Sequence, residues 1–413
     1  MRLNPFKALR PEPARASQVA AVPYDVVTRD EAARLAAGNP HSFLHVGRSD
    51  IDLPPETDPH DDSIYAAARS ALDRFVAEGT LRRDAEPSLY VYRQEMNGRV
   101  QTGVVGCVHI DDYERDVIRK HEKTRKDKED DRTRHVLTLD ANAEPVFLTY
   151  RGSPDVDRVV DRTVQGPPLY DFAADDGVRH TVWRVADTRP LTEAFGHVPV
   201  AYVADGHHRS ASAWRAGREM RARNPNHFGN EEYNWFLAAL FPAGQLAILP
   251  YNRVVKDLAG QTPAQVLERL RSLGRVTATD DPVPPHAGSF CIYLDHHWHL
   301  VELAPSSVPA GDPIGSLDVS LLHDRILGPI LGIGDPRTDQ RVDFVGGIRG
   351  TKELERRVDS GEMALAVSMF PTTLEQLMGV ADAGEVMPPK STWFEPKLRS
   401  GLFVHTLDSP EHA

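Results

Sequence analysis

The sequence VPVAYVADGHHR, residues 198–209, joins an apolar run to a glycine turn and a polar stretch. The run Val198–Val203 predicts a buried strand, and the small residues after Arg209 predict a helix. Gly206 lets the backbone approach a ligand closely, because glycine has no Cβ. The first N–H groups of a helix lack partners within it and lie at the positive end of its dipole. The pattern therefore favours an anion, above all phosphate, at this helix start.

The side chains of the turn fit that interpretation. Arg209 offers a planar fork of donors for phosphate oxygens, and His207 and His208 add two further donors beside the backbone of Gly206. The alternative is that Asp205 only caps the helix while the histidines are surface or core groups. Spacing by itself leaves both interpretations open.

The two adjacent histidines are not expected to bind a zinc ion together. Neighbouring positions on a helix point about 100° apart, so His207 and His208 are poorly placed to bind one metal ion. The HExxH pattern of zinc proteases is also absent, because His121-Glu122 is followed by Arg125 and not by a second histidine. We therefore predict no metal ion held by the protein alone.

A second candidate segment is KHEKTR, residues 120–125, which leads into the charged residues 129–132. Such a charge run is usually a solvated helix face with pairs four residues apart. Phosphoryl transfer to a hydroxyl, however, needs a carboxylate that accepts the proton. Glu122 has the chemistry for that role, with His121 beside it.

A third candidate is the triplet Lys390, Ser391 and Thr392. Two hydroxyls and an ammonium suit a carboxylate or a phosphate, although such triplets are also frequent in ordinary loops. We add Asn252 and Arg253, at the end of a strand predicted from residue 246, as further substrate-binding candidates.

The length of 413 residues predicts at least two domains. Asn97-Gly98 separates two strand-like runs and predicts a β-hairpin. Helical spacing predicts a helix over residues 64–75 that ends at Gly79, and the α and β patterns begin again after residue 255. The expected fold class is α+β.

Composition narrows the function classes. A content of 40% hydrophobic and 26% charged residues is that of a soluble globular protein, and no apolar run is long enough to span a membrane. The N-terminus lacks a secretory signal, and Cys107 and Cys291 match no metal or redox spacing, so we predict a cytoplasmic protein. The net charge of -12 argues against a nucleic-acid partner.

Taken together, the three candidate segments resemble motifs of the SerK-type free-serine kinases, whose fold is related to ParB nucleases and sulfiredoxin. The matching motifs, in the same order, are His121-Glu122, Asp205–Arg209 and Pro389–Thr392. Nearly the whole chain also resembles a bacterial family of unknown function, number 1015. Its hallmarks here are the motif VPYDVV at 22–27, residues 121–132, the turn at 205–209 and the ending at 387–397.

The resemblance implies a ParB/sulfiredoxin-like nucleotide-binding core at residues 111–255. An N-terminal α/β extension would cover residues 1–110, and a C-terminal α+β domain, residues 256–413, would return residues 387–397 to the site. The implied reaction transfers the γ-phosphate of ATP to the hydroxyl of free L-serine and forms O-phosphoserine, a precursor for cysteine synthesis. The implied cofactors are ATP, or ADP, with Mg²⁺. The partners are this nucleotide and a small amino acid, with a homo-oligomer allowed.

The resemblance also implies the residue roles. Glu122 is the general base, and Gly206, His207, His208 and Arg209 bind the nucleotide phosphates. Asp205 orients the histidines or approaches the metal of a Mg-nucleotide. The triplet at 390–392 receives the amino acid or the transferred group.

The related folds supply the alternatives. A sulfiredoxin-like activity is disfavoured, because His207 stands where that family needs a nucleophilic cysteine. A ParB-like DNA switch would be a binding module, but no helix-turn-helix is evident. A nucleotide-binding regulator without catalysis stays open, with Glu122 as the feature that argues against it.

Overall fold

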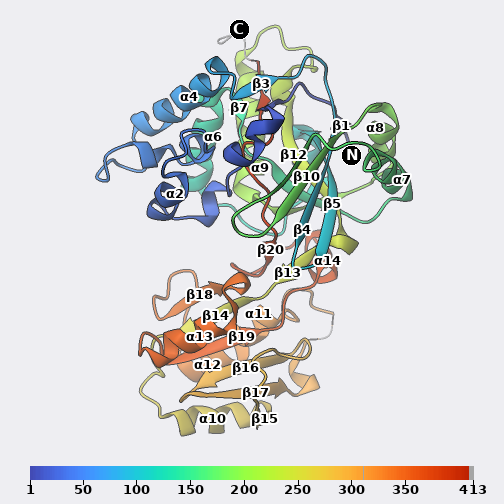
Figure 1. Cartoon of the computed structure of the whole chain (residues 1–413). Coiled ribbons are helices and arrows are strands. Elements are labelled where there is room, and N and C mark those ends of the chain that lie inside the picture. The colour runs from blue at the N-terminus through green and yellow to red at the C-terminus, as the bar shows by residue number, and fades with distance from the viewer. Residues whose placement is uncertain (310, 409–413) are drawn as a thin grey trace. The chain divides into compact units, whose positions relative to one another are not determined.

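A computed structural model describes residues 1–309 and 311–408 and divides the chain into two compact units (Figure 1). Unit 1 contains Met1–Leu246 together with the C-terminal residues from Pro396, and unit 2 contains Ala247–Glu395. Unit 2 is thus inserted in sequence before the last segment of unit 1. The architecture is α+β, as predicted. Strands from both sides of residue 110 share the sheet of unit 1, while the predicted domain boundaries themselves stay a prediction.

Unit 1 is built on a nine-stranded mixed sheet in the order β6-β11-β8-β12-β5-β4-β10-β9, with β1 paired to β5. The strands are β1 (Leu3–Asn4), β4 (Tyr90–Met96), β5 (Arg99–His109), β6 (Ile118–Arg119), β8 (Val146–Tyr150), β9 (Tyr170–Ala173), β10 (Arg179–Arg184), β11 (Ala201–Asp205) and β12 (Trp235–Pro242). Two short ribbons pair β2 (Leu9–Pro11) with β3 (Leu81–Arg83) and β7 (Ala141–Asn142) with β21 (His405–Thr406).

The helices of unit 1 cover this sheet and form a second apolar cluster among themselves. They are α1 (Ala16–Val19), α2 (Arg29–Ala36), α3 (Leu44–Gly47), α4 (Asp62–Ala77), α5 (Ile110–Glu114), α6 (Lys126–Leu139), α7 (Pro154–Thr163), α8 (Arg189–Gly196) and α9 (His207–Arg223). Helix α4 buries its apolar side and is followed by Gly79, whose φ of 67° marks the left-handed residue expected after a helix end.

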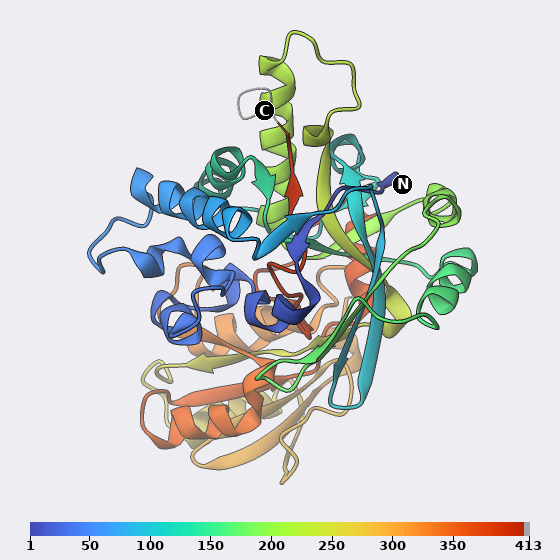
Figure 2. The ribbon, with the colours of Figure 1, turned by 45° about the horizontal axis from the view of Figure 1, so that its top comes forward.

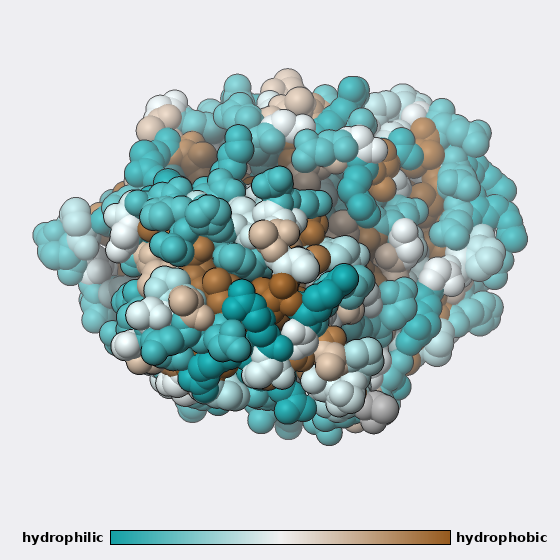
Figure 3. Space-filling view, turned by 90° about the horizontal axis from the view of Figure 1, so that it is seen from below, coloured by the Kyte–Doolittle hydropathy of each residue, from teal (hydrophilic) through white to brown (hydrophobic). Residues whose placement is uncertain are grey.

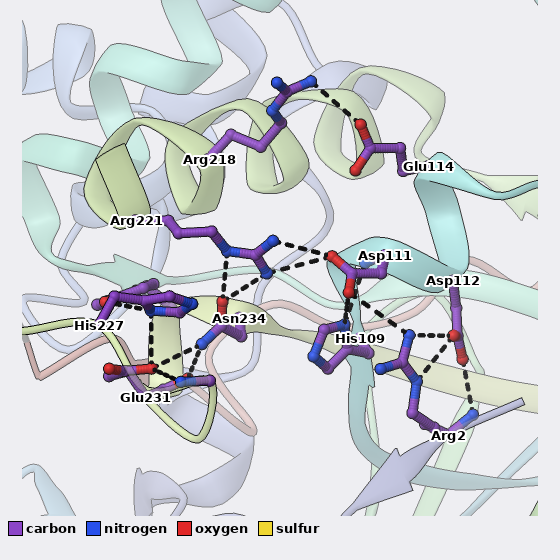
Figure 4. A network of polar contacts seen from close by, with 12 residues as sticks. Arg2, His109, Asp111, Asp112, Glu114, Arg218, Arg221, His227, Glu231 and Asn234 are labelled. Carbon is purple, nitrogen blue, oxygen red and sulfur yellow. Dashed lines mark hydrogen bonds and ion pairs between the residues drawn. The ribbon is translucent and has the colours of Figure 1, made fainter. Parts of the chain in front are cut away.

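The predicted hairpin is confirmed. Strands β4 and β5 pair from Met96↔Arg99 to Tyr90↔Val105, and both Asn97 and Gly98 have positive φ, as a two-residue turn of this kind requires. Helix α9 is held on its outer side by a polar network (Figure 4). Arg221 donates to Asp111 and Asn234, and Arg218 donates to Glu114.

The last segment of unit 1 runs through the interior of that unit (Figure 2). Val404 pairs with Leu9, Ser400 pairs with Ala21, and Leu407 packs with Met220 of α9. These contacts tie down residues that follow unit 2 in sequence. As a result, Lys397 is fixed within unit 1 by its own neighbours.

Unit 2 is a six-stranded antiparallel sheet in the order β15-β17-β16-β19-β14-β18, beside a two-stranded ribbon of β13 and β20. Its strands are β13 (Ala247–Leu249), β14 (Tyr251–Val255), β15 (Gly274–Ala278), β16 (Ser289–Leu294), β17 (His297–Leu303), β18 (Val342–Gly346), β19 (Leu365–Met369) and β20 (Trp393–Glu395). Its helices are α10 (Pro263–Arg271), α11 (Asp318–Leu321), a π-helical turn (Leu322–Leu327), α12 (Gly328–Leu331), α13 (Gly350–Asp359) and α14 (Leu374–Asp382).

The surface drawn in Figure 3 is mostly hydrophilic, with apolar groups in small separate patches. Scattered exposed apolar residues such as Val283 and Ile348 are normal for a folded chain. Among the described residues, no helix has the length and apolar content needed to cross a membrane.

The close approach of β5 and β12 generates a stability prediction. A Cβ built at Gly103 would lie 2.6 Å from the carbonyl oxygen of Leu240, a backbone atom that cannot move aside. Gly103→Ala should therefore lower the free energy of unfolding by about 1–3 kcal/mol, measured by urea denaturation. Gly152→Ala is the control, because nothing lies within 4 Å of its Cβ position. Equal stability of the two variants would contradict the prediction.

Candidate functional site

The candidate site lies at one edge of the unit 1 sheet, where three strands bring distant segments together. Strand β6 runs parallel to β11, so His121 and Asp205 follow the same ends of neighbouring strands. Strand β8 is antiparallel to β11, so Pro145, which precedes it, reaches this edge as well. Because carboxyl ends of parallel strands meet at one sheet edge, segments more than eighty residues apart become neighbours.

Asp205 lies between two cations at this edge. Its Oδ2 accepts a hydrogen bond of 2.6 Å from Arg209 Nη2, and its Oδ1 accepts one of 3.0 Å from Lys397 Nζ. Burial would raise the pKa of Asp205, but Lys397 and Arg209 outweigh burial and hold the pKa below its ordinary value. Asp205 is therefore ionised, and each of its carboxylate oxygens accepts a hydrogen bond from a cation. We call Asp205, Arg209 and Lys397 together the Asp205 ion cluster.

Arg209 points into the protein and is only 8% exposed. Its Nη1 donates to the carbonyl of Pro145 at 2.6 Å, and its Nη2 also lies 3.6 Å from Asp25 Oδ2. Burial lowers the pKa of Arg209, but Asp25 and Asp205 raise it above the ordinary value. Its Nε is the one polar atom of this side chain without a hydrogen bond, and it lies against Gly206.

Gly206 begins helix α9 in the left-handed conformation, with a φ of 93°. No side chain caps this helix start. An added Cβ would lie 3.0 Å from Arg209 Nε, so a side chain at this position would meet both backbone strain and the guanidinium. The helix start thus combines a close backbone turn with the positive end of a seventeen-residue helix.

Glu144 forms the inner wall behind Arg209. Ser400 donates to its Oε1 at 3.1 Å, and burial raises its pKa against the opposing effects of Arg209 and Arg132. A cavity of about 30 Å³ lies between these groups and Ser212 of α9, which is room for one or two water molecules. The cavity is lined by polar and apolar side chains together, and its size permits ordered water.

Glu122 and two histidines form the outer part of the site. Glu122 Oε2 lies 3.8 Å from His207 Nδ1, and the Glu122 side chain is 45% exposed. His207 is buried, and its Nε2 has no hydrogen bond within the described residues. The ring of His121 meets the ring of His207 edge to face at 4.4 Å between centroids. Burial lowers the pKa of His121 to about 4 and that of His207 well below its ordinary value, so both rings are neutral near pH 7.

His208, predicted as a phosphate donor, uses one ring nitrogen within the protein, and its predicted contact with phosphate through the other stays a prediction. Its Nε2 lies 3.1 Å from the backbone N of Arg125, whose N–H can only donate. The imidazole must therefore be neutral at Nε2, with its proton on Nδ1. Burial lowers the pKa of His208, which favours that neutral form. His208 thus ties the loop that carries Glu122 to the start of α9.

A second tie acts on the same loop. Thr124 donates from its hydroxyl to Glu129, and Arg215 of α9 donates to Glu129 Oε2 at 3.2 Å and to Asp130 Oδ1 at 2.6 Å. The run interpreted as one solvated helix face is therefore two structures. Residues 121–125 form an irregular loop with His121 buried, and only Lys126–Leu139 is helix.

The other sequence candidates lie in unit 2. Asn252 and Arg253 belong to β14, where they begin a strand and do not end one. Ser391 is buried and donates to the carbonyl of Pro388 at 2.6 Å, while Lys390 has a positive φ and an exposed side chain. Thr392 follows just before β20. These substrate-binding assignments stay predictions.

Sequence reasoning did not single out Lys397, Asp25 or Glu144 as site residues. Lys397 and Asp25 were each noticed only as part of a longer hallmark motif. An isolated lysine or aspartate carries no local signal of its partner, because the partner is set by the fold. Glu144 lies just before the apolar run of β8, and a carboxylate next to such a run is the local sign that could have drawn attention to it.

The described residues contain no group of three or more His, Cys, Asp or Glu side chains arranged to hold a metal ion. Both oxygens of Asp205 already accept hydrogen bonds from cations. Mg²⁺ is usually held by one or two carboxylates together with substrate phosphates. Among the carboxylates of this site, a partly exposed one such as Asp25 fits this way of binding Mg²⁺.

A comparison with models of protein families identifies the family of this chain. Residues 3–320 match the model described as "Protein of unknown function (DUF1015)", and the chain belongs to this family. No protein with curated annotation matches the chain.

Solved structures show distant likenesses. SbnI with a C-terminal truncation from Staphylococcus aureus matches at 12% identity and a TM-score of 0.39, covering 74% of this chain and 90% of that chain. A conserved hypothetical protein from Pyrococcus furiosus matches at 13% identity and a TM-score of 0.36, covering 74% of this chain and 97% of that chain. A free serine kinase in complex with AMP matches at 12% identity and a TM-score of 0.35, covering 72% of this chain and 91% of that chain. At these values the likeness is too distant to transfer residue roles.

Arg209 provides a test of the Asp205 ion cluster. Arg209→Ala would leave the buried carboxylate of Asp205 with one cation less, so we expect the free energy of unfolding to fall by about 3–5 kcal/mol in urea denaturation. Arg125→Ala is the control, because the exposed side chain of Arg125 forms a surface ion pair with Asp127, so its loss should change stability by less than about 1 kcal/mol. A similar, small loss in both variants would show that the cluster is not structural.

His208 can be tested by matched variants. His208→Gln places an amide oxygen near the Nε2 position, whereas His208→Asn places an amide near Nδ1. We expect hydrogen-exchange protection of the Arg125 amide to persist in the Gln variant and to fall about fivefold or more in the Asn variant.

The hydrogen bond from the Arg125 N–H to His208 Nε2 should depend on pH. The folded-state pKa of His208 is lowered, so its contribution to stability is complete above the ordinary value and is lost as the pH falls through the folded value. Protection of the Arg125 amide should follow this curve in the unmodified chain and should be flat in His208→Gln. Equal protection in all three proteins at every pH would refute the tie.

Proposed function

We propose that this protein is a kinase that transfers the γ-phosphoryl group of ATP to the hydroxyl of free L-serine. The observation that carries the proposal is the approach of Glu122 to the start of α9, with 3.8 Å between Glu122 Oε2 and His207 Nδ1. A carboxylate beside an anion-binding helix start is the pair of groups that transfer to a hydroxyl requires. The three sequence motifs that resemble free-serine kinases support the same reaction.

The anion-binding part of the site would act through the backbone of Gly206 and its successors and through His207. The helix dipole and the N–H groups would attract phosphate oxygens, and within the described residues the buried His207 Nε2 has no hydrogen-bond partner. Arg209 acts as a positioning residue, because its terminal nitrogens already bind Asp205 and Pro145. Asp205 is likewise a positioning residue that orients the turn.

Glu122 would act as the general base. In the transfer, the serine oxygen forms a bond to the γ-phosphorus, the bond from that phosphorus to the bridging oxygen of ADP breaks, and the hydroxyl proton passes to the Glu122 carboxylate. The 45% exposure of this side chain places it within reach of a small acceptor from solvent. Mg²⁺ would neutralise phosphate charge when bound with the nucleotide, and Asp25 is the carboxylate we propose to contact it.

A nucleotide-binding regulator without catalysis is the second candidate. The same helix start would bind a nucleotide in both cases, and it is the placement of Glu122 that favours the kinase. Incubation with ATP, Mg²⁺ and a panel of free amino acids, analysed by mass spectrometry, separates the two. O-phosphoserine supports the kinase, whereas nucleotide binding without any phosphorylated product supports the regulator.

Glu122→Gln tests the base. The amide keeps the size of the side chain but cannot take a proton, so we expect the rate of O-phosphoserine formation to fall about 10²–10⁴-fold. Nucleotide affinity by calorimetry should change little. Glu193→Gln, at an exposed position of α8, is the matched control and should keep full turnover. Full turnover of Glu122→Gln would remove Glu122 from the mechanism.

A further inference from the structure

The last segment of unit 1, residues 397–403, crosses one face of strand β4. Alternate residues of a strand point to the same face, so three side chains of β4 share this one. Each contacts the segment in turn and in antiparallel order; the pairs are Tyr90 with Phe403, Tyr92 with Arg399, and Gln94 with Lys397. The segment is thus laid along β4, and Lys397 is contacted at the end of the strand nearest the hairpin turn.

Gln94 differs from the two tyrosines because it is a fully buried amide. Its exposed fraction is 0%, and that of its cross-strand neighbour Gln101 is 3%. Gln94 Nε2 donates to the carbonyl of Lys397 at 2.8 Å, and Gln101 Nε2 donates to Gln94 Oε1 at 2.9 Å. A carbonyl can only accept, so the contact with Lys397 fixes the orientation of the Gln94 amide. Buried amides cost free energy unless such partners satisfy them.

The hairpin turn decides that the two amides meet. The two-residue turn at Asn97-Gly98 fixes the register in which Gln94 lies directly opposite Gln101. A slip of one residue would turn Gln101 to the opposite face of the sheet, away from the C-terminal segment. The turn therefore sets the place of the amide group that the Lys397 carbonyl meets.

Lys397 connects this amide pair to the start of α9. Gln94 holds its carbonyl, while its Nζ donates to Asp205 Oδ1 at 3.0 Å. The other oxygen of Asp205 accepts from Arg209, whose Nε lies against Gly206. A continuous set of contacts within unit 1 therefore joins the β4–β5 hairpin to the glycine turn that begins the helix.

We propose that Gln94, oriented by Gln101, is a positioning residue for the anion-binding start of α9 and acts through Lys397. Holding the carbonyl of Lys397 limits the positions that its ammonium can reach. That ammonium is one of the two cations that compensate Asp205, so its displacement would leave the buried carboxylate with one cation and let the glycine turn open more often. The effect on nucleotide binding rests on the proposed function, whereas the effect on the turn does not.

The test compares Gln94→Leu with Tyr92→Phe in the full-length protein. Gln94→Leu removes the hydrogen bond to Lys397 and keeps a side chain of similar size, whereas Tyr92→Phe removes a hydrogen bond to His180 on the same strand. We expect Gln94→Leu to weaken the affinity for ADP with Mg²⁺, measured by calorimetry, about fivefold or more. Hydrogen-exchange protection of the Ser210 amide, which closes the first turn of α9, should fall by a similar factor. Tyr92→Phe should change neither quantity.

A double variant tests the route of the effect. Lys397→Met removes the ammonium, so adding Gln94→Leu to it should cause no further loss of Ser210 protection if Gln94 acts through Lys397. Gln101→Leu keeps Gln94 but releases its orientation, so it should cause a smaller loss in the same direction. This variant decides the question if Gln94→Leu does not fold.

The outcomes separate the positioning role from the reaction. Equal losses in Gln94→Leu and Tyr92→Phe, or unchanged Ser210 protection in both Gln94→Leu and Gln101→Leu, overturn the positioning role. If the unmodified chain does not bind ADP, the proposed nucleotide binding fails and Ser210 protection alone decides the role of Gln94. If ADP affinity falls as expected but the unmodified chain forms no O-phosphoserine from ATP and L-serine, the proposed kinase fails while the positioning role stands.

Discussion

The site of unit 1 depends on the burial of one carboxylate between two cations. Asp205 ends the strand β11, Arg209 lies one turn into α9, and Lys397 comes from the last segment of the chain. The carboxylate can stay charged in the interior only because both cations are present. Their contacts fix where the helix begins, which way Gly206 turns and where the C-terminal segment lies.

The cluster changes how the anion site acts. An exposed Arg209 would bind phosphate directly as a planar fork, but the observed Arg209 faces inward and already binds Asp205 and Pro145. In the proposed kinase, the attraction for phosphate would then rest on the helix start and on the neutral histidines. This matters in a chain with a net charge of -12, where the overall field repels anions and local donors must act at short range.

Much of the local structure was predictable because its causes are local. Asn97-Gly98 predicted the hairpin, since few other residue pairs accept two positive φ angles in succession. Strands β16 and β17 likewise coincide with apolar runs of the sequence. Strand β12 is harder to recognise in the sequence, because a central strand buried on both faces lacks the alternation that marks a half-exposed one. The boundary between the loop at 121–125 and helix α6 was not predictable, because charge density does not indicate which residues become buried.

Local composition was enough to identify the strand, the glycine turn and the helix at 198–209, because propensity and spacing act between near neighbours in the chain. Glu122 and the helix start were also recognised as separate chemical candidates in this way. Their approach to each other was decided only by the parallel pairing of β6 with β11, which no short motif encodes. The partners of Asp205 were decided by the return of the chain at Lys397, almost two hundred residues later. Contacts of that range exist only once the sheet has formed, because the folded backbone and not the sequence spacing sets the distance between their atoms.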